Sequence, residues 1–138
     1  TIQAAVLHVK LRQLDNYIDA RREVAAKYDE AFAGIPGVKI PYRADDSKHV
    51  FHQYTLILED ADRTALQDHL LEYEVPSMIY YPIPAHKQKM FASFSLPDTL
   101  LPTTDDLTNR VISLPIHTEM DTEQLTYITE AVLNFINK

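Results

Sequence analysis

The stretch His49–Glu59, with the sequence HVFHQYTLILE, decides the fold of this chain. If it is a β-strand, successive side chains point to opposite faces, which gives the stretch two sides. Both sides are substantially apolar, which is typical of a central strand covered on two faces. One side would carry Val50, His52, Tyr54, Leu56 and Leu58, and the other Phe51, Thr55 and Ile57.

The residues before this strand predict one long helix over 1–33. Apolar side chains recur at intervals of three and four residues from Ile2 onward, and Thr1 stands where an N-cap would be. Gly34 follows the last repeat, as is common where a helix stops. Because the helical period is complete at Ile2, we expect a helix entered partway along a longer chain. Residues 38–48 are expected to form a polar loop.

Capping residues predict three more helices after the strand. An acidic or hydroxyl side chain at the N-cap accepts hydrogen bonds from the first turn of a helix, and a partner three residues later completes a capping box. The candidates are Asp60 or Asp62 for a helix to about Tyr73, Thr103 with Asp106 for a helix to about Arg110, and Asp121 with Gln124 for the last helix.

Two shorter strands are predicted, over residues 75–81 and 111–114. The order of helices and strands then predicts an α+β fold, in which a small antiparallel or mixed three-stranded sheet packs with about four helices. All 138 residues are expected to form a single small domain. In it, the long helix over 1–33 leads into a sheet-and-helix sandwich over 49–138.

Composition excludes several classes of protein. The two glycines, Gly34 and Gly37, share one turn, so no glycine-rich loop exists for a self-contained Rossmann or Walker nucleotide site. With 13 basic and 20 acidic residues, the net charge of −7 argues against nucleic-acid and anionic-membrane partners. Cysteine is absent, which excludes thiolate chemistry and favours a cytoplasmic location. Neither a signal peptide nor a transmembrane segment is predicted.

Six histidines invite a metal site, but their spacing argues against one. The interval of three residues between His49 and His52 points the two side chains to opposite faces of a strand. We therefore expect no metal ligands, with an exposed His49 and a half-buried His52. The helical histidines His8 and His69 are expected to face solvent.

Carboxylates and lysines give no catalytic signal. Adjacent acids such as Asp105 and Asp106 usually cap helices or meet solvent, whereas a hydrolytic pair requires a fixed separation across a cleft. A Schiff-base lysine needs an apolar setting that lowers its pKa. Lys87 and Lys89 instead lie in a polar run.

The segment Ile79–Gln88, with the sequence IYYPIPAHKQ, is the strongest candidate for a binding site. It concentrates two tyrosines, an imidazole and an amide in a loop stiffened by prolines, which holds donors and acceptors in place at low entropic cost. A tyrosine ring with its hydroxyl suits a sugar or a base. Equally, Tyr80 and Tyr81 could simply end a strand, with one ring in the core and the other outside.

Several motifs, in order, resemble the C-terminal domain of a known enzyme family. That family is the DegT/DnrJ/StrS class of sugar-nucleotide aminotransferases, which depend on pyridoxal phosphate (PLP) and have the aspartate-aminotransferase fold, fold type I. The likeness covers essentially the whole chain. The matching residues are Thr1–Leu7, Lys10-Leu11, Leu14-Asp15, Arg21-Arg22, Tyr28, His52-Gln53-Tyr54, Tyr81–Gln88 and Ile112–His117.

The resemblance implies a reaction in which glutamate gives its amino group to PLP, and the keto sugar of a nucleotide-sugar then receives it. In this family the lysine that binds PLP lies in a large N-terminal domain, which this chain lacks, so the chain alone is expected to be inactive. The resemblance places Tyr80, Tyr81 and His86 at the nucleotide-sugar as binding residues, with no catalytic residue here. It also implies a homodimer.

Two other functions compete with this interpretation. A small ferredoxin-like module for ligand sensing or protein interaction would have a similar topology without catalysis. A metal-dependent hydrolase is a third possibility, which metal analysis would test. An aminotransferase requires a large domain with its lysine before Thr1. Without that domain, apolar helix surface would be uncovered, and we expect the chain alone to self-associate, as light scattering would show.

Overall fold

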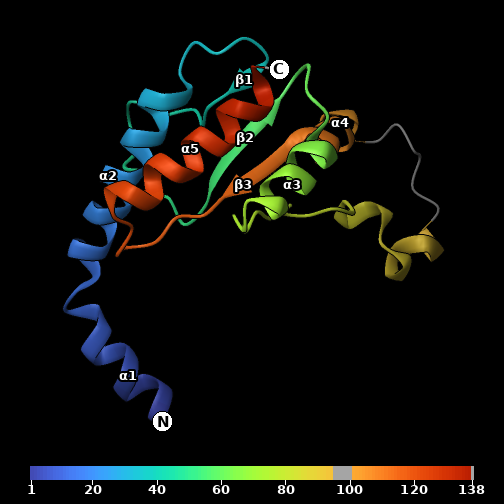
Figure 1. Cartoon of the computed structure of the whole chain (residues 1–138). Coiled ribbons are helices and arrows are strands. Elements are labelled where there is room, and N and C mark those ends of the chain that lie inside the picture. Colours follow the sequence, from blue (N-terminus) through green and yellow to red (C-terminus); the bar gives the residue numbers. More distant parts are fainter. Residues whose placement is uncertain (95–100, 138) are drawn as a thin grey trace.

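The computed structural model describes residues 1–94 and 101–137 of the chain. Figure 1 shows a body of helices and a small sheet, from which the first helix projects. The helices and strands, in chain order, are α1 (Ile2–Leu11), α2 (Leu14–Phe32), β1 (Val38–Lys39), β2 (Tyr54–Leu58), α3 (Arg63–Glu72), the 3-10 helices η1 (Ala85–Lys87) and η2 (Lys89–Phe94), α4 (Pro102–Arg110), β3 (Val111–Leu114) and α5 (Thr122–Ile136).

The sheet has three antiparallel strands in the order β1-β2-β3. Tyr54 lies opposite Leu114 and Ile57 opposite Val111, while Val38 of β1 pairs with the far end of β2. The α+β class, the antiparallel three-stranded sheet and the central position of β2 are thus confirmed. The described residues form five α-helices, compared with the four or so expected.

One face of β2 forms the centre of the hydrophobic core. Tyr54, Leu56 and Leu58 are buried there, together with side chains from α2, α3, β3 and α5. The opposite face is only partly covered, because Thr55 and Ile57 remain half-exposed. The expectation of a strand buried on both faces is therefore wrong, and apolar residues on the second face reflect β-propensity more than burial.

The strand is also shorter than predicted, since residues 49–53 do not follow its alternation. Phe51 has a φ of +47°, a left-handed conformation that interrupts an extended strand. This turn buries Phe51 with the core residues of β2, whereas Val50 and His52 become exposed. The predicted faces therefore hold only from Tyr54 onward.

Two helices, not one, occupy residues 1–33. Thr1 caps α1 as predicted, with its Oγ1 accepting a hydrogen bond from Ala4 N (3.3 Å). However, the chain turns at residues 12 and 13 before α2 begins. The apolar stripe continues across this turn, so periodicity alone could not reveal it. No residue of α1 is buried, and Ile2 is 86% exposed. This apolar helix is the uncovered surface on which the expected self-association depends.

The third strand of the sheet is not the predicted one. Val38 and Lys39, expected in a polar loop, form β1 at one edge. The predicted strand over 75–81 contributes only an isolated bridge between Met78 and Ser113 at the other edge. Pro76 lies inside this segment and Pro82 follows it, and a residue without an N–H group cannot extend a ladder of hydrogen bonds.

Two of the three predicted helix caps are confirmed. The carboxylate of Asp62 accepts hydrogen bonds from Thr64 N (2.8 Å) and Ala65 N (3.1 Å) at the start of α3. Asp121 begins α5 with the full capping box described below. The third prediction is wrong, because α4 begins at Pro102 and Thr103 lies inside the helix. Proline fits the first helical position, since its missing N–H would have no partner there.

Replacing Asp121 with alanine should lower the free energy of unfolding by about 1 kcal/mol. Its Oδ1 accepts a hydrogen bond from Gln124 N (2.8 Å), and Gln124 Oε1 accepts one from Asp121 N (3.3 Å). Urea unfolding followed by circular dichroism would measure the loss. Thr103→Ala is the matched control, expected to change stability by less than about 0.5 kcal/mol. Equal losses in both variants would contradict the assignment of the cap.

Candidate functional site

Tyr80 and Tyr81 lie two and three residues after Met78, which forms the last backbone pairing of their segment. Met78 N donates to Ser113 O (3.0 Å) and Ser113 N donates to Met78 O (2.8 Å), which anchors the chain beside β3. Beyond this anchor, Tyr80 is 41% exposed and Tyr81 is 72% exposed, with their rings edge to face at a centroid distance of 5.9 Å. Both phenols can therefore meet a ligand by ring contact or by hydrogen bonding.

A cavity of about 200 Å³ lies beside Tyr80. Its polar lining consists of Tyr80, Ser113, and the side chains of His52 and Gln53, which precede β2; the rest is apolar. Among the residues that the structure describes, no acidic, lysine or arginine side chain lines it. Such a mixture of apolar surface and uncharged donors and acceptors suits a neutral polar ligand, such as a sugar ring, better than a phosphate group.

The sequence reasoning missed His52 and Gln53 as possible site residues. It expects His52 to be half-buried, whereas the turn at Phe51 leaves that imidazole exposed. Neither His52 nor Gln53 forms a side-chain hydrogen bond with another residue in the described ranges, so their polar atoms remain available. The signal that could have found them is their place in the motif His52-Gln53-Tyr54.

His86 lies on η1 and faces α4 rather than the cavity beside Tyr80. Its side chain is only 8% exposed, and Nε2 lies 3.2 Å from Oδ1 of Asp105. Nζ of Lys87 lies 2.9 Å from Oδ2 of the same carboxylate. The hydrogen bond from Lys87 lowers the pKa of Asp105 below its ordinary value, so the carboxylate is charged at neutral pH. The structure thus brings Tyr80 and Tyr81 together and places His86 in a separate charged cluster.

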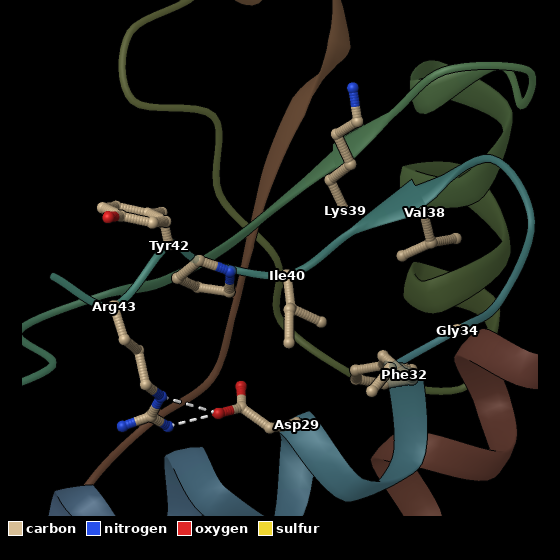
Figure 2. A pocket seen from close by; sticks show the side chains of 10 residues that line it. Asp29, Phe32, Gly34, Val38, Lys39, Ile40, Tyr42 and Arg43 are labelled. Carbon is tan, nitrogen blue, oxygen red and sulfur yellow. Dashed lines mark hydrogen bonds and ion pairs between the residues drawn. The ribbon is translucent and has the colours of Figure 1, made fainter. Parts of the chain in front are cut away.

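A larger pocket, of about 540 Å³, opens where the residues after β1 pass the end of α2 (Figure 2). Asp29 Oδ2 accepts hydrogen bonds from Nε (2.8 Å) and Nη2 of Arg43, and Asp29 Oδ1 accepts one from the hydroxyl of Tyr54 (2.8 Å). The guanidinium of Arg43 lies 4.4 Å from the ring centroid of Phe51. These groups satisfy one another, so their role is to hold residues 40–53, and hence His52, against α2.

Metal-binding residues do not gather in the part of the chain that the structure describes. No group of three or more His, Asp or Glu side chains there could hold an ion. His69 is not simply solvent-exposed, as expected, because Nε2 lies 3.0 Å from Ala131 O and the ring packs against Tyr73 and Phe135. Within the described ranges, every helix is too short or too polar to cross a membrane.

Comparison with protein families identifies the chain as a whole. Residues 1–133 match the model of the DegT/DnrJ/EryC1/StrS aminotransferase family. The chain belongs to this family. The resemblance predicted from its motifs is confirmed, and the match includes both the segment of Tyr80 and Tyr81 and the residues that line the cavity beside it.

Individual members of the DegT/DnrJ/EryC1/StrS family are similar to this chain in sequence and in structure. The chain is 36% identical over 131 residues to dTDP-3-amino-3,6-dideoxy-alpha-D-galactopyranose transaminase of Aneurinibacillus thermoaerophilus, covering 95% of this chain and 35% of that protein. The structure of this chain matches that of DesV from Streptomyces venezuelae in complex with a ketimine intermediate, with a TM-score of 0.92 and 32% identity. The match covers 99% of this chain and 36% of DesV. The chain therefore spans about a third of the length of these relatives.

A solved structure that shares the fold of this chain holds PMP, the aminated form of PLP. A sugar aminotransferase of Streptococcus pneumoniae was solved in its PMP-form, and it shares the fold of this chain with a TM-score of 0.85 at 21% identity, over 94% of this chain and 33% of that protein. The described lysines of this chain do not fit the cofactor. All of them are exposed, and Lys27, Lys39 and Lys87 are paired with carboxylates, so none lies in the apolar setting that a Schiff-base lysine needs.

Proposed function

We propose that this chain is the C-terminal, substrate-binding portion of a PLP-dependent aminotransferase. That enzyme would move an amino group from glutamate to the keto sugar of a nucleotide-sugar. The observation that carries the proposal is the family match over residues 1–133 in a chain that spans about a third of its relatives. A large domain of the same polypeptide would hold PLP, and the enzyme would be a cytoplasmic homodimer.

The described residues of this chain would bind and orient the nucleotide-sugar. Tyr81, the more exposed of the two rings, is suited to stack against the base or the sugar, and Tyr80 would contact the sugar at the mouth of the cavity. His52 and Gln53 would offer hydrogen bonds to its hydroxyl groups. His86 would help to orient the nucleotide-sugar. The uncharged lining supports placing the sugar, rather than the diphosphate, in this cavity.

The chemistry of amino transfer would come from PLP, which acts as an electron sink when bound. Because the described lysines of this chain do not fit a cofactor site, no chemical step is assigned to its residues. The chain alone should therefore bind substrate at most, without turnover.

Replacing Tyr81 with alanine in the complete polypeptide should raise the KM for the nucleotide-sugar about tenfold, because one stacking contact is lost. Steady-state transamination of dTDP-keto sugars with glutamate would measure this. Tyr42→Ala is the matched control, since Tyr42 is also exposed but does not line the cavity beside Tyr80. Its KM should stay within twofold of the parent value.

The same assay tests the proposed function itself. The complete polypeptide should aminate a nucleotide-linked keto sugar, and the 138-residue chain should show no turnover under identical conditions. Amination by the chain alone would overturn the proposal that this chain only binds substrate and that a separate large domain holds PLP. Failure of the complete polypeptide with every nucleotide-linked keto sugar would overturn the function.

A further inference from the structure

One carboxylate on α4 holds two consecutive residues of η1. Asp105 directs Oδ1 to Nε2 of His86 (3.2 Å) and Oδ2 to Nζ of Lys87 (2.9 Å). The neighbouring Asp106 pairs instead with Arg110, one helical turn later. Of the two adjacent acids, therefore, only Asp105 connects α4 to the segment that carries the tyrosines.

The contact with His86 differs from an ordinary surface ion pair. Both Nε2 of His86 and Oδ1 of Asp105 are buried, and within the described ranges neither atom has a hydrogen bond of good geometry. They face each other at ion-pair distance, and buried polar atoms are costly unless another polar group compensates them. The carboxylate is therefore the group that keeps the imidazole in place.

The contact between Asp105 and η1 also limits the freedom of Tyr80 and Tyr81. Tyr80 and Tyr81 lie in a short segment that is held at both ends, by the paired backbone of Met78 and Ser113 on one side and by Asp105 on the other. Pro82 and Pro84 restrict the backbone between the tyrosines and η1. Fixing η1 on α4 therefore restricts where the two phenols can go.

We propose that Asp105 is a positioning residue that clamps η1 to α4 and thereby orders Tyr80 and Tyr81 before the nucleotide-sugar binds. This inference rests on the proposed function of the two tyrosines. Ordering a binding segment in advance removes an entropic cost from association.

The test compares Asp105→Asn with Asp106→Asn in the complete polypeptide. The asparagine has the same shape but loses the charge that holds His86 and Lys87. Asp105→Asn should raise the KM for the dTDP-keto sugar roughly 10-fold or more. The half-reaction with glutamate should be unchanged, and Asp105→Glu should restore part of the affinity. Asp106→Asn should match the parent enzyme in all of these measurements.

A second measurement does not depend on activity. Amide hydrogen exchange over residues 79–87 should become faster in Asp105→Asn but not in Asp106→Asn, with the same unfolding midpoint for both variants. Unchanged exchange, or an unchanged KM, would overturn the inference, as would an equal loss in both half-reactions. If the parent polypeptide aminates no nucleotide-sugar, the proposed function fails, whereas the exchange experiment still decides whether Asp105 forms the clamp.

Discussion

The Tyr54→Ala variant of this chain is expected to lose about 3–5 kcal/mol of its free energy of unfolding. Tyr54 is completely buried on the central strand, and its ring lies 4.8 Å from that of Tyr28 between centroids. Alanine would leave a cavity between β2 and α2 and would also remove the hydroxyl that donates to Asp29. Urea unfolding, monitored by circular dichroism, would measure the change.

Two further variants separate the sources of this loss. Tyr54→Phe keeps the ring and removes only the hydrogen bond to Asp29 Oδ1, so about 1–2 kcal/mol should be lost. Tyr42→Ala removes a tyrosine that is 85% exposed, and its stability should change by less than about 0.5 kcal/mol. If Tyr54→Ala were no more damaging than Tyr42→Ala, the core described here would be wrong.

The stability of the chain should fall steeply above about pH 10. Burial raises the pKa of Tyr28 and of Tyr54 well above their ordinary value of 10.0, and for Tyr54 the hydrogen bond to Asp29 adds to the effect. Below pH 10 both tyrosines are protonated whether the chain is folded or unfolded, so their contribution to the free energy of unfolding is fully present. Above it the unfolded chain releases two protons that the folded chain retains.

The expected slope follows from this proton count. Each retained proton lowers the free energy of unfolding by about 1.4 kcal/mol per pH unit, and two tyrosines by about twice that. Urea unfolding from about pH 9 to about pH 11 would measure the slope, with the absorbance of phenolate as a second readout. The double variant Tyr28→Phe/Tyr54→Phe should lose most of the slope. A slope unaffected by that variant would contradict the raised pKa values.

Local signals in the sequence predicted part of the fold, because some contacts are short-range. The carboxylates of Asp62 and Asp121 cap helices whose first turns immediately follow them, so the necessary partners are adjacent in sequence. The central strand was found because its apolar content is high from Tyr54 to Leu58. In both cases the physical cause lies within a few residues.

The features that were missed depend on tertiary contacts. Val38 and Lys39 are a strand only because β2 offers them a partner. The left-handed turn at Phe51 places the ring of this residue in the core, and no local sequence pattern marks the turn. Residues 75–81 have β-forming composition, but only Met78 forms a β-bridge, to Ser113. Such pairings are long-range, and single-sequence patterns do not specify them.

The candidate site shows the same division. Its tyrosines could be selected from the sequence because aromatic rings in a proline-rich loop are a local signal, and their role in binding stays a prediction. The cavity that they share with His52 and Gln53 joins residues from separate parts of the chain. The partner of His86 is equally remote, since Asp105 looks like an ordinary acid of a first helical turn.

The sheet described above also bears on how this chain would behave at high concentration. One edge is the two-residue strand β1, and the other is partly occupied by the bridge to Met78. Fibrils grow by adding strands to long, open edges, and short or blocked edges oppose this. In the described residues the largest unprotected apolar element is instead the helix α1. Crowding should therefore produce helix-mediated, reversible clusters rather than amyloid.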